Sequence, residues 1–578
     1  MNQAHVDLVA IARQEMIDRG FSPDFSPAVE KQLQTIHAEP TAGLRDLTGV
    51  LWSSIDNDDS RDLDQIEWAE RVDGGIRVCV GVADVDSVVA KGTPIDTHAC
   101  HDTTTVYAGV RTFPMLPERL STDLTSLSEN GDRAAIVIDM VVAGDGSVSG
   151  GSIYAARVRN RAQLTYNGVG PWLESHAAAP AKVAASPELA AQLKLQDEAA
   201  QALREARHEL GALTFDRVET QAVVVNGQVR DVVARPHNRA ARLIEDFMIA
   251  ANEVMARTLR AAGVSSIRRV VKDPERWPRI VELAGSCGDQ LPPSPDAAAL
   301  NGFLMRRKDA DPAHFADLSL AVLKLMGPGE YAVMRPGGAG MGHFALAAID
   351  YTHSTAPNRR FADLVTQRLL KGVGRGAPYQ DEELDSIARN CTLKEDAARK
   401  VQRDMNKRMA AVALAGRIGQ AFQAVVTGVT PKGVFVRSFD PPVEGRLMGG
   451  FGYRTDPFSG EGSVMHTGVD ISAPPGTPVR ATADGLVTYA AWDRGYGQLV
   501  VVDHGGGVET YYAHLSRFAV VEGQEVRRGD QVGAVGSTGR VTAPHLHYEV
   551  RLGGTPVNPH PYLARAGVVQ LVKKDFPF

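Results

Sequence analysis

Short runs of β-branched and apolar residues, separated by turn residues, characterise the chain from about residue 48 to residue 160. The segments IRVCVGVADV (76–85) and AAIVIDMVVAG (134–144) carry this pattern and predict strands. Residues 1–45, which precede them, have the pattern of a small, mostly helical lead-in. We therefore expect a sheet in this part of the chain, preceded by a short helical segment.

Helical patterns dominate the next part of the chain. Residues 186–210 open with a Ser cap followed by Pro at the first helical position, and residues 239–263 end in Gly. Residues 381–416 are rich in strong helix formers. Within this last stretch, five basic residues between Arg399 and Arg408 form either a solvated helix face or a face turned toward RNA.

After these helices the pattern returns to strands. Residues 419–447 have the pattern of about half of a small barrel, and Gly, Pro and His become frequent from residue 449. The strand-like runs GLVTYAAW, QLVVVDHG and ETYYAHL alternate with tight turns and predict an all-β domain. We therefore predict a multidomain α+β protein. Its expected parts are a helical lead-in (1–45), a mixed region (46–418), a partial barrel (419–448), an all-β domain (449–565) and a tail (566–578).

Composition and charge limit the classes of function. The 578 residues are 44% hydrophobic and 23% charged, which is typical of a soluble protein with several domains. The formal net charge of −7 argues against a globally basic nucleic-acid binder but leaves room for a local basic channel. The four cysteines are widely separated and form no CxxC pair, which argues against a disulfide framework and a thiolate zinc site.

The chain carries no recognisable membrane or export pattern. Its first twenty residues lack a basic start followed by an apolar run, and no stretch approaches the ~20 apolar residues of a membrane span. We therefore expect a cytoplasmic protein that does not contact a membrane. The sequence makes no prediction of the oligomeric state.

The segment IDNDDSRDLDQ (55–65) holds five aspartates within nine residues. Oxygen ligands at short spacing suit a hard cation such as Mg²⁺ or Mn²⁺, which would also remove the repulsion between the carboxylates. Asp62 and Asp64 lie on one side of an extended chain, and Asp56 can fold back to the same point. From spacing alone, a catalytic metal site and an acidic surface loop or calcium-type structural site remain open, although the EF-hand pattern fails.

Three further segments give this cluster a context. VCVGVADVDSVVAKGTPID (78–96), TVYAGVRTFPMLPERLSTDLTSL (105–127) and HFALAAIDYTHSTAPNRRFADLVTQRLLKG (343–372) follow it in that order. Together the four resemble the RNB-type catalytic domain of the ribonuclease II / ribonuclease R family, over about residues 45–425. The resemblance implies a hydrolytic exoribonuclease that uses Mg²⁺ to degrade single-stranded RNA from its 3′ end into nucleoside monophosphates.

The resemblance also assigns the metal site. Three of the family's four metal-site aspartates match residues of this chain, namely Asp56, Asp62 and Asp64. The fourth position is Gln65, whose amide oxygen can coordinate a cation but brings no charge. The second metal ion would then bind weakly, or Asp58 or Asp59 would compensate. Asp64 is expected to be essential for cleavage.

Other matched positions concern the RNA. Tyr107 corresponds to an aromatic residue that stacks near the scissile nucleotide, and Arg359 to an arginine that contacts the scissile phosphate. Gln402 stands where the family often has a glutamate. The lead-in is too short for tandem cold-shock barrels, which implies a smaller RNA-gripping element. The partial barrel breaks off near Leu447, before the five strands that an OB-fold needs.

A second set of ligands lies in the all-β part. His466 and Asp470 are four residues apart in a strand-and-loop context, and His545 and His547 share one face of a strand. Three ligands from this set would leave zinc an open fourth position, which is the catalytic arrangement. A lone histidine is more often structural, but three histidines and an aspartate at these spacings favour a metal site.

Residues 449–564, which contain HTGVD (466–470), YYAHL (511–515) and HLHYEV (545–550), resemble the lysostaphin/LytM-type zinc endopeptidases. By this resemblance His466, Asp470 and His547 bind Zn²⁺. His514 and His545 would handle protons and polarise the scissile carbonyl. Members of this family cleave peptide cross-links in bacterial peptidoglycan.

Three hypotheses follow. We favour a 3′-to-5′ exoribonuclease with a fused zinc endopeptidase domain, because the ribonuclease-like part fills most of the chain. The alternative is a peptidoglycan-cleaving zinc metalloendopeptidase whose amino-terminal RNB-like part is a weakened RNA-binding module. A gene fusion in which neither site meets its usual substrate is the third. The expected partners are single-stranded RNA and, for the second site, peptidoglycan peptides.

Overall fold

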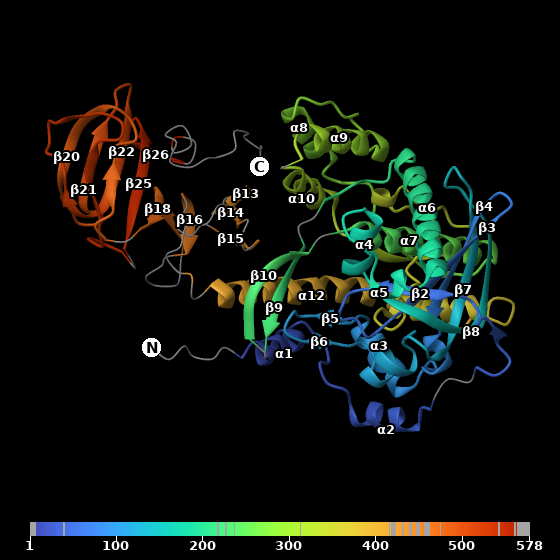
Figure 1. The fold of residues 1–578 in the computed structure, drawn as a ribbon. Coiled ribbons are helices and arrows are strands. Elements are labelled where there is room, and N and C mark those ends of the chain that lie inside the picture. Colours follow the sequence, from blue (N-terminus) through green and yellow to red (C-terminus); the bar gives the residue numbers. More distant parts are fainter. Residues whose placement is uncertain are drawn as a thin grey trace. The chain divides into compact units, whose positions relative to one another are not determined.

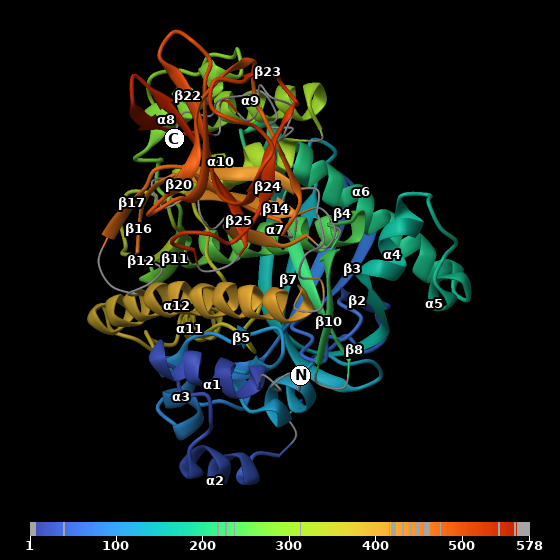
Figure 2. The same cartoon turned by 90° about the vertical axis from the view of Figure 1, so that its left-hand side faces the viewer.

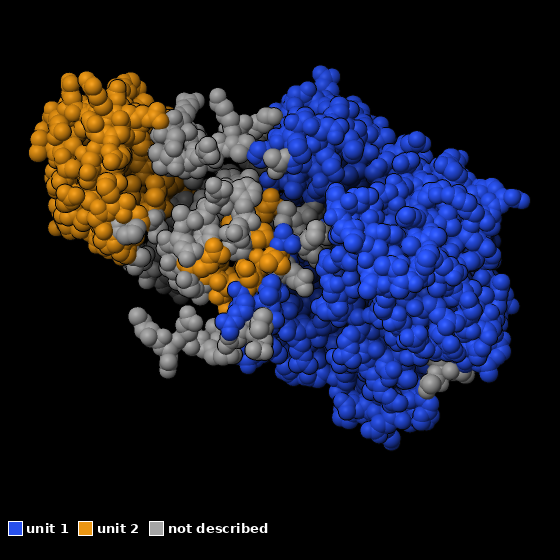
Figure 3. Space-filling view, in the orientation of Figure 1, with its two compact units in different colours: residues 1–230, 234–409 blue, residues 231–233, 410–578 orange. Residues whose placement is uncertain are grey.

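The structure is a computed structural model, and the chain divides into two compact units, Met1–Arg230 with Ala234–Met409, and Asp231–Val233 with Ala410–Phe578 (Figure 3). The described residues are 7–37, 41–216, 219–225, 228–235, 237–312, 314–414, 417, 424–430, 433–438, 442–446, 451–455, 463–473, 475–541, 544–559 and 562. The predicted tail (566–578) and the predicted end of the partial barrel at Leu447 lie outside the described residues.

A mixed six-stranded sheet belongs to the first unit, and most of its strands lie toward the right in Figure 1. Its strands are β1 (Arg45–Asp46), β2 (Trp52–Asp56), β3 (Gln65–Val72), β4 (Gly75–Ala83), β7 (Asp132–Val142) and β8 (Val148–Thr165). The strand order is β1-β8-β2-β3-β4-β7, and β8 also pairs with β7, so the sheet closes on itself. The strands predicted within 76–85 and 134–144 are β4 and β7, which confirms both.

Helices make up most of the rest of this unit, and only some of them contact the sheet. The helices are α1 (Leu8–Asp18), α2 (Pro27–Thr35), α3 (Pro94–Asp102), α4 (Tyr166–Leu173), α5 (Ala181–Ala184), α6 (Pro187–Glu209), α7 (Arg239–Ala261), α8 (Trp277–Ser286), α9 (Ala297–Ala310), α10 (Phe315–Met326), α11 (Phe361–Gly372) and α12 (Asp381–Leu414). Pairs of short strands complete this part: β5 (Val106–Tyr107) with β6 (Thr112–Phe113), β9 (Glu219–Val225) with β10 (Gln228–Arg235), and β11 (Ser266–Val270) with β12 (Glu330–Met334). No helix among the described residues combines the length and the apolar character needed to cross a membrane.

Both faces of the sheet are buried, which explains the nearly continuous apolar runs of β4 and β7. One face packs with residues of α3, α11 and α12, and the other with residues of α4, α6 and α7. Local chemistry fixes the helix ends: the Ser186 side chain accepts a hydrogen bond from the Leu189 amide, and Asn238 caps α7 through the Ala241 amide. The three long helices predicted from the sequence are confirmed as α6, α7 and α12.

The predicted lead-in contains two helices, α1 and α2, and α1 lies against α12 (Figure 2). Arg19, which caps the end of α1, pairs with Asp404 of α12 at 2.8 Å, and Arg408 of α12 pairs with Glu15 of α1 at 2.5 Å. Part of the basic stretch 399–408 is therefore used to hold the lead-in. This is a third use, beyond the solvated face and the RNA-facing face that the sequence left open.

The second unit consists of strands. The described strands are β13 (Ala424–Thr430), β14 (Gly433–Ser438), β15 (Glu444–Arg446), β16 (Gly452–Thr455), β17 (Ser463–His466), β18 (Val469–Ser472), β19 (Pro478–Arg480), β20 (Gly485–Asp493), β21 (Gly497–Asp503), β22 (Val508–Phe518), β23 (Glu525–Val526), β24 (Gln531–Val535), β25 (His545–Leu552) and β26 (Thr555–Val557). From β18 onward they form a nine-stranded sheet, as the all-β prediction requires. In the segment predicted as a partial barrel, the described residues form the three-stranded antiparallel sheet β13-β14-β15.

Glu67 is a buried carboxyl group that lacks hydrogen-bond partners. Glu67 of β3 lies opposite Ser53 of β2, is 0% exposed, and neither of its carboxylate oxygens has a hydrogen-bond partner. Burial raises the pKa of Glu67 well above its usual value, and the charge of Asp56 adds to the effect. The folded protein therefore keeps a proton on Glu67 that the unfolded chain releases above pH ~4.5.

Replacing this residue tests that reasoning. Because the folded state must retain the proton, its stability falls as pH rises above the ordinary glutamate pKa, and Glu67→Gln removes this loss. We expect the variant to gain about 1–3 kcal/mol of unfolding free energy at pH 8 and much less at pH 5, measured by urea denaturation. Glu282→Gln, at an exposed position of α8, is the matched control. A gain that is equal at both pH values would contradict the assignment.

Candidate active sites

The aspartate-rich segment 55–65 connects β2 to β3. Asp56 is the last residue of β2, and Gln65 is the first of β3. The Ala83 amide donates a hydrogen bond to the Asp64 carbonyl oxygen at 2.9 Å, which continues the pairing of β3 with β4 to this residue. The backbone of Asp64 is therefore held by the sheet, whereas the residues between it and Asp56 form a turn.

The Asp64 carboxylate is joined to a distant segment of the chain. Its Oδ1 accepts from the Asn358 amide at 3.1 Å, and its Oδ2 accepts from Arg359 Nε at 3.2 Å. The side chain is only 2% exposed. Burial raises the pKa of Asp64 to about 7, although the positive charge of Arg359 opposes the shift. This predicted catalytic residue is thus a carboxylate whose ionisation depends on a nearby cation.

Asp62 and Tyr107 complete this group. Burial also raises the pKa of Asp62, and the nearby Arg359 and Tyr107 act in the opposite direction. Tyr107 lies on β5 and is 43% exposed, so its ring is accessible for stacking. The Thr105 amide donates to the Arg359 carbonyl oxygen at 2.9 Å, which ties the two segments together. The structure therefore brings Asp62, Asp64, Tyr107 and Arg359 to one place.

The remaining acidic residues differ from one another. Asp56 accepts from its neighbour Asn57 at 2.7 Å and from Ser60 Oγ at 2.8 Å, and its charge contributes to the raised pKa of Asp62. Asp58 is exposed and hydrogen-bonded to Asn167, and Asp59 is exposed. Among the described residues, three potential ligand atoms within 4.8 Å of one another occur at the histidine cluster and not here. The carboxylate oxygens of Asp56, Asp62 and Asp64 are ligands that suit hard divalent cations. They lie farther apart than the ligand atoms of the histidine cluster.

Two glutamines singled out from the sequence occupy different environments. Gln65, at the position of the family's fourth aspartate, is buried on β3 and pairs in register with Val82 of β4. Gln402 is exposed on α12. Among the described residues, no side-chain hydrogen bond joins either glutamine to Asp64 or Arg359.

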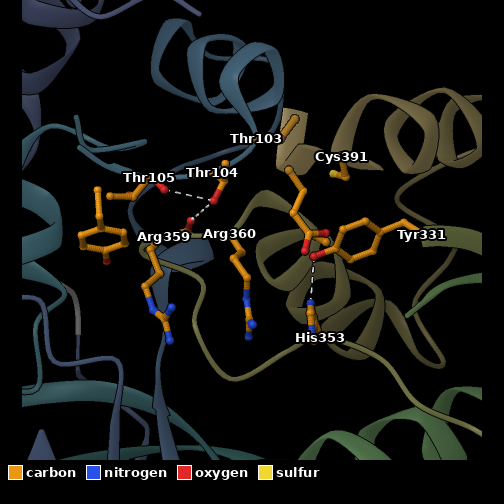
Figure 4. Close-up of a pocket in the computed structure, with 11 residues that line it drawn as sticks. Thr103, Thr104, Thr105, Tyr331, His353, Arg359, Arg360 and Cys391 are labelled. Carbon is orange, nitrogen blue, oxygen red and sulfur yellow. Dashed lines mark hydrogen bonds between the residues drawn. The ribbon is translucent and has the colours of Figure 1, made fainter. Parts of the chain in front are cut away.

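A recess of about 150 Å³ adjoins Arg359 (Figure 4). Its lining comprises Thr103, Thr104, Thr105, Tyr107, Tyr331, His353, Arg359, Arg360, Ala362, Cys391 and Glu395. The Tyr331 hydroxyl hydrogen-bonds to His353 Nδ1 at 2.8 Å, and burial lowers the pKa of His353 well below its usual value. Thr103 adopts a left-handed conformation with φ 58°, which is rare for a β-branched residue. The recess extends the space beside the aspartates, and sequence reasoning did not predict it.

The histidine cluster of the second unit is compact. His466 Nε2 lies 3.0 Å from Asp470 Oδ1 and 3.0 Å from His547 Nδ1, and the last two atoms are 2.8 Å apart. Tetrahedral zinc with ligands at about 2.0–2.1 Å would hold such atoms ~3.3 Å apart. The three predicted ligands are therefore assembled almost at the spacing that zinc requires, and these residues fit the metal.

Strand register creates this arrangement. Asp470 of β18 pairs with His547 of β25, and Ser472 pairs with His545. A Cβ atom at position 468 would come within 2.9 Å of His547 Nε2 and 2.4 Å of the Tyr548 carbonyl oxygen, so Gly468 is required there. Burial alone would raise the pKa of Asp470, but hydrogen bonds from His466, His545 and His547 outweigh it and hold the pKa far below its usual range.

The other two histidines lie beside the ligands. The rings of His514 and His545 are 4.9 Å apart between centroids, and His545 Nε2 is 3.3 Å from Asp470 Oδ1. His514 Nδ1 donates to the Thr538 carbonyl oxygen at 2.8 Å, which leaves Nε2 without a hydrogen in the neutral ring. Burial lowers the pKa of His514 to about 4. At neutral pH the ring is therefore neutral, and its unprotonated Nε2 can accept a proton.

Sequence reasoning missed one residue of this centre. Glu549 is 0% exposed and contacts His547 Nε2 at 2.9 Å. The pattern His-x-His-x-Glu from residue 545 to residue 549 could have indicated it, because alternate residues of a strand share one face.

Comparison with known proteins assigns both units. Residues 44–376 match the RNB domain family, and residues 464–559 match Peptidase family M23. Ribonuclease R of Escherichia coli (strain K12) is 30% identical over 444 residues, which cover 72% of this chain and 53% of that protein. Ribonuclease R of Thermotoga maritima is 29% identical over 429 residues, with 71% and 58% covered.

The fold comparison agrees. The structure titled Mycoplasma genitalium RNase R in complex with ribose methylated single-stranded RNA has a TM-score of 0.69 at 23% identity, covering 76% of this chain and 70% of that one. At this identity the likeness shows the fold, and it confirms the predicted fold class. The chain spans 52% to 59% of the length of the first curated relatives that it matches. The chain belongs to the RNB domain family, and its carboxyl-terminal part carries a Peptidase family M23 domain.

Proposed function

We propose that the protein is a 3′-to-5′ exoribonuclease that hydrolyses single-stranded RNA to nucleoside monophosphates. The observation that carries this proposal is the buried Asp64 carboxylate bound to Arg359, beside the accessible ring of Tyr107. The relatives named ribonuclease R support the same reaction. RNA as the substrate favours a cytoplasmic location.

The proposed roles follow from the chemistry of each side chain. Asp56, Asp62 and Asp64 would hold Mg²⁺ or Mn²⁺, with the Gln65 amide at the fourth position. When bound, the cations supply an activated water and neutralise charge on the phosphodiester. Arg359 offers its guanidinium to the scissile phosphate, since only Nε is used by Asp64. Tyr107 stacks on a base without reading its identity.

We further propose that the second unit is a zinc endopeptidase domain, with His466, Asp470 and His547 as the ligands. Bound zinc would polarise a water molecule at its open position and the scissile carbonyl of the substrate. His514 is neutral and would accept a proton, and His545 would donate to the developing oxyanion. Peptidoglycan peptides are the proposed substrates, because the lysostaphin/LytM-type endopeptidases that this unit resembles cleave them.

A second candidate function assigns the enzymatic activity to the other unit. In it, the zinc endopeptidase is the working enzyme and the RNB part is a weakened RNA-binding module. The charge lost at Gln65 favours this candidate. The structure titled yeast Ssd1, a pseudonuclease, has a TM-score of 0.59 at 18% identity, so the same fold also occurs in a protein described as a pseudonuclease.

An RNA-cleavage assay separates the two candidates. With Mg²⁺ and single-stranded RNA labelled at one end or the other, the protein should release labelled mononucleotides only from 3′-labelled RNA. Asp64→Asn should lower kcat at least ~100-fold, because one charge at the reacting centre contributes several kcal/mol, while RNA binding is retained. Asp73→Asn, in the exposed turn between β3 and β4, is the control. Equal rates for Asp64→Asn and the wild type would refute the site.

Metal binding at the aspartates should depend on pH. Because the pKa of Asp64 is about 7 without a cation, binding must displace its proton below that pH. We expect the Mn²⁺ dissociation constant of the zinc-loaded protein, measured by electron paramagnetic resonance, to rise about tenfold per pH unit below 7 and to level off above it. Gln65→Asp should tighten binding at pH 8. A constant affinity from pH 6 to pH 8 would contradict the proposed ligand.

Elemental analysis tests the zinc site independently of the nuclease. The purified protein should contain about one zinc per chain by the open-site geometry. His466→Ala should lose that zinc together with any peptidoglycan-clearing activity, since two ligands remain. His504→Ala, which alters a histidine of the same unit outside the cluster, should keep it. Unchanged zinc content in His466→Ala would overturn the ligand assignment.

A further inference from the structure

The alternation of β25 places a carboxylate directly behind a predicted zinc ligand. Glu549 follows His547 by two residues, and both side chains are buried. Glu549 accepts hydrogen bonds from four side chains, namely His547 Nε2 (2.9 Å), Tyr496 Oη (2.8 Å), Arg551 Nε (2.8 Å) and the Thr467 hydroxyl. A carboxylate with this many donors is fixed in place and remains an acceptor.

The two ring nitrogens of His547 face different partners. Nδ1 lies 2.8 Å from Asp470 Oδ1 and 3.0 Å from His466 Nε2, on the side where the metal would sit. Nε2 faces Glu549 Oε1 at 2.9 Å. Both nitrogens therefore face a carboxylate oxygen, which can only accept. A cation held by Asp470, His466 and Nδ1 would exclude a hydrogen from Nδ1, so the single hydrogen of the neutral ring would then lie on Nε2, where Glu549 accepts it. The lone pair on Nδ1 is then available to a cation.

Glu549 itself is too enclosed to act on a substrate. Its side chain is 0% exposed. Its Oε1 accepts hydrogen bonds from His547, Thr467 and Tyr496, and its Oε2 accepts one from Arg551. The contact with Nε2 places it on the side of the ring opposite the ligand atoms. A role as general base or as a further metal ligand therefore conflicts with its position.

The same network reaches a second histidine of the centre. Tyr496 donates its hydroxyl to Glu549, and its backbone carbonyl oxygen accepts the His514 amide at 2.8 Å. Arg551 Nη2 also donates to the Tyr496 hydroxyl at 3.0 Å, and its guanidinium lies 4.2 Å from the Tyr511 ring. Glu549 is thus part of a rigid support that reaches both a ligand and the proposed proton acceptor.

We propose that Glu549 is a positioning residue that fixes the Nε2–H form of His547 and thereby presents Nδ1 to zinc. The inference rests on the zinc site of the proposed function. Carboxylates that accept from the second nitrogen of a metal-bound histidine orient the ring and raise its basicity, and their loss weakens metal binding about 10- to 100-fold.

The test measures zinc affinity of the full-length protein by competition with a chromophoric chelator. Glu549→Gln should raise the zinc dissociation constant by about 10- to 100-fold. Tyr496→Phe, which removes one donor but keeps the carboxylate, should produce a smaller increase. Glu525→Gln makes the same change at an exposed position of β23 and should have no effect. A dissociation constant for Glu549→Gln that stays within about twofold of the wild type would overturn the proposal, since losing a carboxylate that orients a metal ligand has a larger effect.

A second readout separates positioning from a purely structural role. In wild-type protein loaded with cadmium and labelled with nitrogen-15 histidine, the metal should couple to Nδ1 of His547, while Nε2 carries a hydrogen. Coupling to Nε2 would overturn the proposal even if Glu549→Gln does not fold. A wild-type protein that binds no zinc would refute the zinc site as well, whereas zinc binding that is insensitive to Glu549→Gln would refute only this inference.

Discussion

The ion pair between Asp64 and Arg359 is the interaction on which the first centre depends. An almost fully buried carboxylate is stable as an anion only beside a cation. Arg359 provides that cation, and the Asn358 amide adds a hydrogen bond to the other oxygen. The pair joins the beginning of β3 to the segment that precedes α11, so residues 295 positions apart meet at one point. The recess and the accessible Tyr107 are arranged around this connection.

The two centres use carboxylates in different ways. Asp64 and Asp62 have raised pKa values because burial outweighs the opposing charge of Arg359, so a metal cation in addition to Arg359 is needed to ionise this centre fully near neutral pH. Asp470 and Glu549 have lowered pKa values because several donors outweigh burial. The second centre is therefore held by hydrogen bonds in its ionised form, whereas cation binding at the first is coupled to loss of a proton.

Sequence patterns predicted the elements whose causes are local. Ser186 with the following proline marked the start of α6, and the apolar run of β4 marked a buried strand. The HTGVD and HLH spacings predicted His466, Asp470 and one histidine of the HLH segment as ligands, and the family resemblance selected His547. The structure brings these three together, because strand alternation acts within short segments.

Features that depend on contacts between distant segments escaped prediction. Nothing in the sequence near Glu67 indicates that it lies unpaired in the core, and the pairing of Arg408 with Glu15 joins residues 393 positions apart. The density of aspartates in residues 55–65 did not reveal that Asp58 turns toward Asn167 while Asp64 is buried. In each case tertiary packing decided which of several similar side chains meets which partner.

Anomalous scattering from crystals soaked in Mn²⁺ tests the central claim most directly, because it locates the cation without relying on activity. We predict at least one anomalous peak about 2.0–2.3 Å from a carboxylate oxygen of Asp64, with Asp56 or Asp62 as a second ligand. A map that shows Mn²⁺ at the histidine cluster but none beside Asp64 would contradict the nuclease site.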